Sequence, residues 1–315
     1  MTGTRRRAAV NVDIDGLYLY DRIHGHAGGA GNAAGFVAAT HDPTAWTRAM
    51  PRFLELFARC NLRATLFCVA QDLDHPEVRA VLADCVAEGH EIGNHSLTHP
   101  YDLSRQRPET VAHEVATARK RLQDATGQPI SGFRAPGYVL SPALLTAIAD
   151  AGHTYDSSRF PCPSYQAAKA AVIALYRVQG RPSGSVAEAP HVWFGRRTPY
   201  VDRLDDGRAL VELPIGALPA TRLPYFGTTL ILMGTPGYAA MAPLLARTDW
   251  INFECHALDL TDHAGDNIPA RLAVQPDQRM PLARKWPLFL RALEDLKLHH
   301  EVRTLGEWAE SPDRF

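Results

Sequence analysis

Short apolar runs alternate with longer amphipathic segments over most of the 315 residues. The run ATLFCVA at 64–70, for example, is apolar almost throughout. Runs of this kind are typical of parallel strands that are covered by helices on both faces of the sheet. We therefore predict strands at 8–15, 64–70, 90–95, 132–136, from 154 onward, 211–216, 250–256 and 301–305.

The segments between these strands repeat apolar side chains at helical spacing, as the stretch 42–59 illustrates. Asp42 can cap its start, Pro43 suits the first turn, and apolar residues follow every three or four positions from Trp46. Pro51 is expected to kink or split this helix, because proline has no N–H to donate. Further helices are predicted at 76–89, 108–125, 141–152, 236–247 and 281–299.

This alternation predicts an α/β fold, and the chain length suits one large barrel or two ordinary domains. Between 160 and 209 the pattern fails, because Pro, Gly, Arg and aromatic residues are mixed there. We expect an insertion or cap, whose aromatic side chains wall off a small pocket, line a sugar cleft, or are simply scattered over the surface. No internal repeat is present, so one barrel domain over 1–315 is the economical interpretation.

The composition argues against several classes of partner. The 33 Lys and Arg residues nearly balance the 34 Asp and Glu residues, so the chain has no basic footprint for nucleic acid or a membrane surface. No apolar run reaches the roughly 18 to 20 residues of a membrane span. Asn11 and Asp13 interrupt the apolar stretch near the N-terminus before it could serve as a signal peptide, so we expect a cytoplasmic protein. The five cysteines include no C-x-x-C pair and are expected to be reduced.

Polar side chains stand where the predicted strands end, which is the edge that carries the site in parallel α/β folds. Asp13 and Asp15 are two apart, so on a strand both carboxylates face the same side. His95 and His99 are four apart, and a helical turn would point both rings the same way. Two imidazoles and one carboxylate suit a catalytic zinc ion, which leaves one aspartate for proton transfer.

Each of these features also has an ordinary explanation. A D-x-D at a strand end can be a solvated turn or a helix cap, and two histidines can simply be surface or core residues. Arg134 alone would form a structural ion pair, and His256 alone would be a satisfied core histidine. The ordinary explanations do not account well for the occurrence of all these residues together at strand ends.

The motifs VDIDG, GHEIGNHSLTHP, FRAPGY, YDSS and FECHALD, taken in this order from about residue 8 to 260, resemble the polysaccharide deacetylases, also called the NodB-homology group or carbohydrate esterase family 4. The resemblance implies a distorted (β/α)7 barrel. It also implies removal of acetyl groups from N-acetylated sugars by a divalent metal, most often zinc, with cobalt, nickel or iron as alternatives.

Position by position, the resemblance implies that Asp15, His95 and His99 are the metal ligands. Asp13 would be the catalytic base, and Arg134 would keep that base ionised. The aspartates here are separated as D-I-D, whereas many members of the family have them adjacent.

The resemblance further implies that His256 is the acid that protonates the leaving amine, and that the backbone N–H of Gly137 helps to hold the oxyanion. Tyr138 would contact the substrate, although it stands one place later than the aromatic residue of the family motif. Asp156 or Asp259 would orient His256 or bind substrate, and the sequence does not choose between them.

The substrate predicted on these grounds is an N-acylated amino sugar, free or carried on a lipid or a nucleotide. A deformylase or an amidohydrolase of small cyclic amides is an alternative on the same barrel, since the H-A after the last strand resembles the lipid-linked aminoarabinose deformylases. An iron oxygenase also uses two histidines and one carboxylate, and a sugar-binding protein could retain the metal without activity. Barrels of this kind often self-associate, so a homo-oligomer is also expected.

Overall fold

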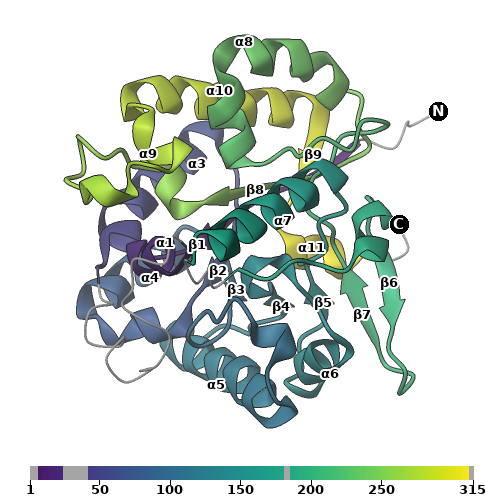
Figure 1. Cartoon of the computed structure of the whole chain (residues 1–315). Helices are drawn as coiled ribbons and strands as arrows, with labels where there is room; N and C mark the ends of the chain where they lie inside the picture. Colours follow the sequence, from purple (N-terminus) through teal and green to yellow (C-terminus); the bar gives the residue numbers. More distant parts are fainter. Residues whose placement is uncertain (1–5, 24–41, 181–184, 312–315) are drawn as a thin grey trace.

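The computed structural model describes residues 6–23, 42–180 and 185–311 (Figure 1). One sheet runs through the molecule in the order β6-β7-β5-β4-β3-β2-β1-β8, with β9 paired to β1. Every pair in it is parallel except the hairpin of β6 and β7 at one edge. Among the described residues the sheet curls without closing through a strand ladder. The predicted α/β class and distorted barrel are confirmed.

The elements alternate along the chain as the apolar pattern predicted. The strands are β1 (Arg6–Ile14), β2 (Thr65–Cys68), β3 (Glu91–Asn94), β4 (Gly132–Phe133), β5 (Tyr155–Asp156), β6 (Tyr200–Arg203), β7 (Ala209–Glu212), β8 (Trp250–His256) and β9 (His300–Val302). The α-helices are α1 (Leu17–Ile23), α3 (Met50–Cys60), α4 (Pro76–Ala87), α5 (Pro108–Thr126), α6 (Pro142–Asp150), α7 (Pro163–Val178), α8 (Gly227–Leu245), α9 (Pro276–Arg279), α10 (Leu282–His299) and α11 (Leu305–Ala309). Short turns of other helical types are η1 (Ala45–Ala49), η2 (Ala70–Asp74), η3 (Leu103–Arg105), η4 (Pro136–Tyr138), η5 (Pro190–Phe194), η6 (Ala257–Leu260) and η7 (Ala270–Leu272).

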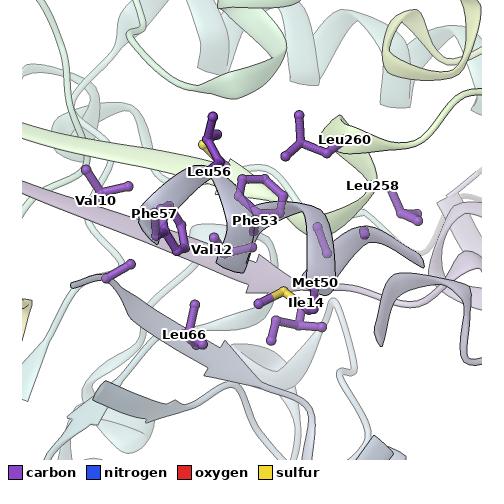
Figure 2. Packing of buried hydrophobic residues seen from close by; sticks show 14 of the residues in the cluster. Val10, Val12, Ile14, Met50, Phe53, Leu56, Phe57, Leu66, Leu258 and Leu260 are labelled. Carbon is purple, nitrogen blue, oxygen red and sulfur yellow. The ribbon is translucent and has the colours of Figure 1, made fainter. Parts of the chain in front are cut away.

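Strand β1 forms the centre of the core. Its residues from 8 to 14 are all buried, and its outward-facing side chains Val10, Val12 and Ile14 pack under helix α3 (Figure 2). Helix α3 contributes Phe53 and Phe57 to the same cluster. Burial of a side chain of this size stabilises a fold by about 1.5–3 kcal/mol, so this cluster fixes β1 and the polar residues at its carboxyl end.

The open side of the sheet is bridged by a non-strand segment that follows β7. Gly216 donates its N–H to Asn252 O on β8 at 2.8 Å, and the Asn252 side chain donates to Leu213 O at 2.9 Å. A Cβ on Gly216 would lie 2.7 Å from Asn252 O, so no larger residue fits this approach. The strand predicted at 211–216 therefore ends at Glu212, because Pro214 cannot donate a hydrogen bond to a neighbouring strand. The residues that follow form the bridge to β8.

Three further predicted elements differ from the structure. The helix at 42–59 is a π-helical turn, η1, followed by α3, which begins where Pro51 can occupy the first turn. The helix predicted at 236–247 corresponds to the second part of α8: this helix begins earlier, at Gly227, and breaks at Gly234, which places Pro236 in the first turn after the break. The last strand, predicted at 301–305, is β9, and Thr304 instead caps α11.

The segment 160–209 forms helix α7, the turn η5 and the edge strand β6. Residues 181–184 within it lie outside the described part of the chain. The interpretation of the chain as one domain over 1–315 stays a prediction. The five cysteines are buried and unpaired, and no described helix is both long and apolar enough to cross a membrane.

Candidate metal centre and active site

A cavity of about 330 Å³ lies at the carboxyl ends of the strands, beneath helix α7, which crosses in front of these ends in Figure 1. The sheet register explains why polar residues meet there, since Asp13 on β1 lies beside His256 on β8 and beside Phe67 on β2. Seven of the ten predicted site residues line the cavity. They are Asp13, Asp15, His95, His99, Gly137, Tyr138 and His256.

Three of these residues form a buried cluster that could hold a metal ion. The Nε2 atoms of His95 and His99 lie 3.4 and 3.5 Å from Asp15 Oδ1, and one ligand atom from each residue lies within 4.8 Å of the other two. Asp15 Oδ1 has no hydrogen-bond partner among the described residues. A buried carboxylate oxygen facing two ring nitrogens is the donor set of a divalent transition metal, so these residues fit the predicted metal.

The charges of Asp15 and His99 agree with that assignment, whereas Asp13 and Asp15 raise the pKa of His95. Burial alone would raise the pKa of Asp15, but attraction to His99 and His95 holds it well below the usual value. Burial lowers the pKa of His99 to about 3. An ionised carboxylate and a neutral imidazole are the forms that bind metal.

A hydrogen bond from the neighbouring strand orients His95. Its Nδ1 lies 2.8 Å from Arg134 O, and if Nδ1 carries the proton, Nε2 is left facing Asp15 with a free electron pair. Such outer contacts fix the tautomer and the ring plane of a metal-binding histidine.

The loop that carries both histidines is not the helical turn that their spacing suggested. Ser96 and His99 both have left-handed backbones, with φ of 67° and 55°. Non-glycine residues adopt this conformation only at an energetic cost, and such residues cluster at functional sites. The turn is held because Asn94 accepts the N–H of Ser96 at 2.9 Å, and the Ser96 hydroxyl accepts the N–H of His99 at 3.0 Å.

Glu114 on α5 ties down the middle of this loop. Its carboxylate accepts the N–H groups of Leu97 and Thr98 at 3.0 and 2.9 Å and the Thr98 hydroxyl at 2.7 Å. We expect Glu114→Ala to weaken metal binding by roughly 10- to 100-fold, as loss of an outer contact usually does. Leaving buried donors unpaired should also lower the free energy of unfolding by about 1–3 kcal/mol.

Metal titration and urea unfolding of this variant would test the expectation, with Glu109→Ala in the first turn of the same helix as control. Unchanged metal affinity in Glu114→Ala would show that the loop holds its shape without this carboxylate.

Arg134 holds Asp13 in a fully buried network. Its guanidinium donates to Asp13 Oδ1 at 2.8 Å, to Asn11 Oδ1 at 2.5 Å, and to the backbone and hydroxyl of Ser157 at 2.7 and 2.8 Å. It also lies over the ring of Phe67, 4.4 Å from the centroid. Asp13 Oδ2 is left without a hydrogen-bond partner among the described residues, on the side of His95 Nε2 at 4.0 Å.

His256 lies between a buried carboxylate and a phenol. Its Nδ1 is 3.2 Å from Glu254 Oε1, and its Nε2 is 3.2 Å from Tyr138 Oη and 3.9 Å from Asp15 Oδ2. Burial alone would lower the pKa of His256, but the nearby negative charge of Glu254 raises it. Burial in turn raises the pKa of Glu254 to about 8, so this buried pair retains a proton near neutral pH that His256 can give up.

Glu254 is the site residue that the sequence interpretation missed. It is completely buried and lies two positions before His256 on β8, which puts both side chains on the same face. The spacing is the same as that of Asp13 and Asp15, so the signal was present in the sequence. Between hydrophobic neighbours in an apolar strand, a lone glutamate is easily taken for an outward-facing residue.

The two aspartates offered as partners of His256 are placed differently. Asp259 accepts the backbone N–H of His256 at 2.9 Å, and a Cβ on Gly227 would collide with it. Asp156 accepts the N–H and the hydroxyl of Ser158 and is paired with Glu212. Neither is among the described residues that line the cavity.

Gly137 and Tyr138 form a tight left-handed turn at the cavity wall, with φ of 65° and 64°. The N–H of Tyr138 is donated inside this turn to Ala135 O at 2.9 Å. The N–H of Tyr138 is therefore not available to an oxyanion. The oxyanion contact predicted for the N–H of Gly137 stays a prediction.

Comparisons with known proteins agree with this geometry. The family model described as polysaccharide deacetylase matches residues 31–155. A chitooligosaccharide deacetylase from Bradyrhizobium sp. (strain ANU 289) is 36% identical over 104 residues, which are 32% of this chain and 46% of that protein. A peptidoglycan-N-acetylglucosamine deacetylase from Bacillus cereus is 26% identical over 117 residues, 37% of this chain and 53% of that protein. The matches thus span about half the length of these relatives.

Solved structures show the same fold over nearly the whole chain. A Mycobacterium smegmatis structure assigned as a polysaccharide deacetylase has a TM-score of 0.60 at 17% identity, covering 100% of this chain and 93% of that one. The PuuE allantoinase has a TM-score of 0.59 at 14% identity, covering 98% and 91%. Residues 31–155 match the polysaccharide deacetylase family, and this match confirms the resemblance of the motifs.

Proposed function

We propose that the protein hydrolyses the N-acyl amide, in the first place an N-acetyl amide, of an amino sugar or glycoconjugate. One observation carries the proposal: three groups lie around a single cavity at the sheet edge. They are the candidate metal cluster, the Asp13 carboxylate paired with Arg134, and His256 beside the carboxylate of Glu254. Water adds to the amide carbonyl, the C–N bond breaks, and the products are a carboxylate and an amine.

Asp15, His95 and His99 would hold the divalent metal, zinc in the first place. Bound there, it would supply Lewis acidity and lower the pKa of water toward ~7. Asp13 would then accept the water proton through Oδ2, the oxygen that Arg134 leaves unpaired. A positioned general base of this kind typically contributes about 10²- to 10⁴-fold in rate.

His256 would protonate the leaving nitrogen through Nε2, the ring atom that faces the cavity and Tyr138. Glu254 Oε1 lies 3.2 Å from the opposite ring nitrogen, so Nε2 is the ring atom left to give its proton to the substrate. This arrangement favours hydrolysis over an iron oxygenase, which uses the same ligand types but needs neither the Asp13–Arg134 pair nor an acid at His256.

The names of the relatives suggest where to look for the substrate. They act on chitooligosaccharides and on the N-acetylglucosamine of peptidoglycan, so acetylated chitooligosaccharides and peptidoglycan fragments are the first candidates. Allantoinase shares the fold, which keeps small cyclic amides as a second candidate, and formylated amino sugars as a third.

Release of acetate or formate, together with the new amine, should be measured for these three groups of substrates. Acetate released from an N-acetylated sugar, in equal amount to the free amine, is the expected result. Ring opening of allantoin without turnover of any acylated sugar would overturn the proposal in favour of the cyclic-amide alternative.

The role given to Glu254 can be tested separately. Glu254→Gln should lower kcat by about tenfold or more, but by less than the ~10²- to 10⁴-fold expected on removal of the acid itself. The alkaline limb of the pH profile should also move to lower pH. The reason is that Glu254 raises the pKa of His256. Without the negative charge of Glu254, His256 loses its proton at a lower pH.

Glu301→Gln, a half-buried glutamate at β9, is the matched control. A Glu254→Gln profile that drops in height but keeps its alkaline limb would assign Glu254 to the stability of the strand only.

A further inference from the structure

Lys169 brings a cation to the cavity. It stands on α7, and its Nζ donates to Gly137 O at 2.8 Å, beside the candidate metal centre. A Cβ on Gly137 would lie 3.6 Å from this Nζ and 3.2 Å from the ring of Tyr101. The Tyr101 ring in turn packs edge-on against His99, with 4.7 Å between centroids. The ammonium group is therefore one aromatic ring away from a candidate metal ligand.

No carboxylate neutralises this ammonium at close range. Among the described residues, none forms an ion pair with Lys169 within 4.0 Å. Glu188 is the negative charge that acts on it, and the two oxygens of Glu188 accept the N–H groups of Leu140 and Ala189. Burial lowers the pKa of Lys169 to about 8, and Arg105 adds a second positive charge on this side.

The surroundings make this charge costly without a ligand. Val172 and Ile173 of the same helix line the wall next to it, and so does Tyr165. Lys169 is the one lysine or arginine among the described residues that line the cavity. A half-buried ammonium has three donors, and a single backbone carbonyl accepts one of them here. An unpaired charge in an apolar wall is disfavoured unless something pairs with it.

We propose that Lys169 selects amino sugars that carry an anionic group, a carboxylate or a phosphate, on the Gly137 side of the acylamino group. This inference rests on the proposed function and names the class of substrate within it. The anion would occupy the two remaining donors of the ammonium group, and the sugar would lie between Lys169 and the candidate metal centre.

Three purified N-acetylated substrates test the proposal: neutral N,N′-diacetylchitobiose, N-acetylmuramic acid with its carboxylate, and N-acetylglucosamine 1-phosphate. In the wild type, kcat/KM for one anionic substrate should exceed that for the neutral one by roughly 10- to 100-fold, mainly through KM, as expected for a charge-assisted hydrogen bond. Lys169→Met should abolish this preference, and Lys169→Arg should keep most of it. Lys120→Met, at an exposed lysine paired with Asp124 on α5, is the control for general loss of charge.

The two anionic substrates distinguish the source of the negative charge, since the preferred one identifies carboxylate or phosphate. Equal kcat/KM for neutral and anionic substrates in the wild type would overturn the proposal. An equal fall in kcat/KM for all three substrates in Lys169→Met would also overturn it, because Lys169 would then only support the Gly137 turn.

A binding measurement separates this proposal from the proposed hydrolysis. Calorimetry with N-acetylglucosamine 1-phosphate and with N-acetylglucosamine should give at least tenfold tighter binding of the phosphate, and the difference should vanish in Lys169→Met. If no substrate releases acetate but this difference is found, the proposed function fails and the anion site stands. Equal binding of both sugars would refute the anion site whatever the activity.

Discussion

Asp13→Asn is expected to lower kcat by about 10²- to 10⁴-fold while the protein keeps its fold and its metal. Asparagine has the same shape and can still accept the hydrogen bond that Arg134 now gives to Oδ1 at 2.8 Å. The amide cannot take up the water proton, however, and it leaves Arg134 without its buried counter-charge. The measurement is acetate release at saturating substrate, together with metal content per chain.

Asp124→Asn is the matched control, because Asp124 is an exposed aspartate on α5 that pairs with Lys120. It should retain wild-type turnover. If Asp13→Asn also retained wild-type turnover with its metal in place, the base would have to be another residue.

His95→Ala and His99→Ala are each expected to lose the metal. Each removes one of three ligands from a cluster in which both rings lie within 3.5 Å of Asp15 Oδ1. The fall in metal affinity should therefore exceed the ~10- to 100-fold that is typical for loss of an outer contact. Elemental analysis of protein purified without chelator, followed by zinc titration, measures this effect.

His113→Ala is the control, since His113 lies exposed on α5 and contacts Thr117. It should bind as much metal as the wild type. A wild-type metal content in either of the other two variants would remove that histidine from the ligand set.

The sequence predicted those parts of the site that depend on strand periodicity. Asp13 and Asp15 could be placed on one face because side chains alternate along a strand, and His256 could be placed at the end of β8. The carboxyl ends of parallel strands share one edge, so these residues could be expected to meet. The structure brings them around one cavity.

The remaining parts depend on contacts between distant segments, which periodicity does not carry. The turn at His99 is left-handed because Ser96 and Glu114 hold it, and Glu114 comes from a helix that begins after the loop. Lys169 reaches the cavity only because α7 crosses it, in a segment where the apolar pattern had failed. The predicted helix 236–247 covers only the second part of α8, because the part from Gly227 to the break at Gly234 was not predicted.

The most direct test of a metal-dependent deacylase is one titration with two readouts. The protein is stripped of metal with a chelator, zinc is returned in steps, and bound zinc and acetate release are measured on the same samples with the best N-acetylated sugar. Our account predicts negligible acetate release without metal, a linear rise with bound zinc, and a plateau at about one ion per chain. Full acetate release from the metal-free protein, or none at full zinc occupancy with any of the acylated sugars, would contradict it.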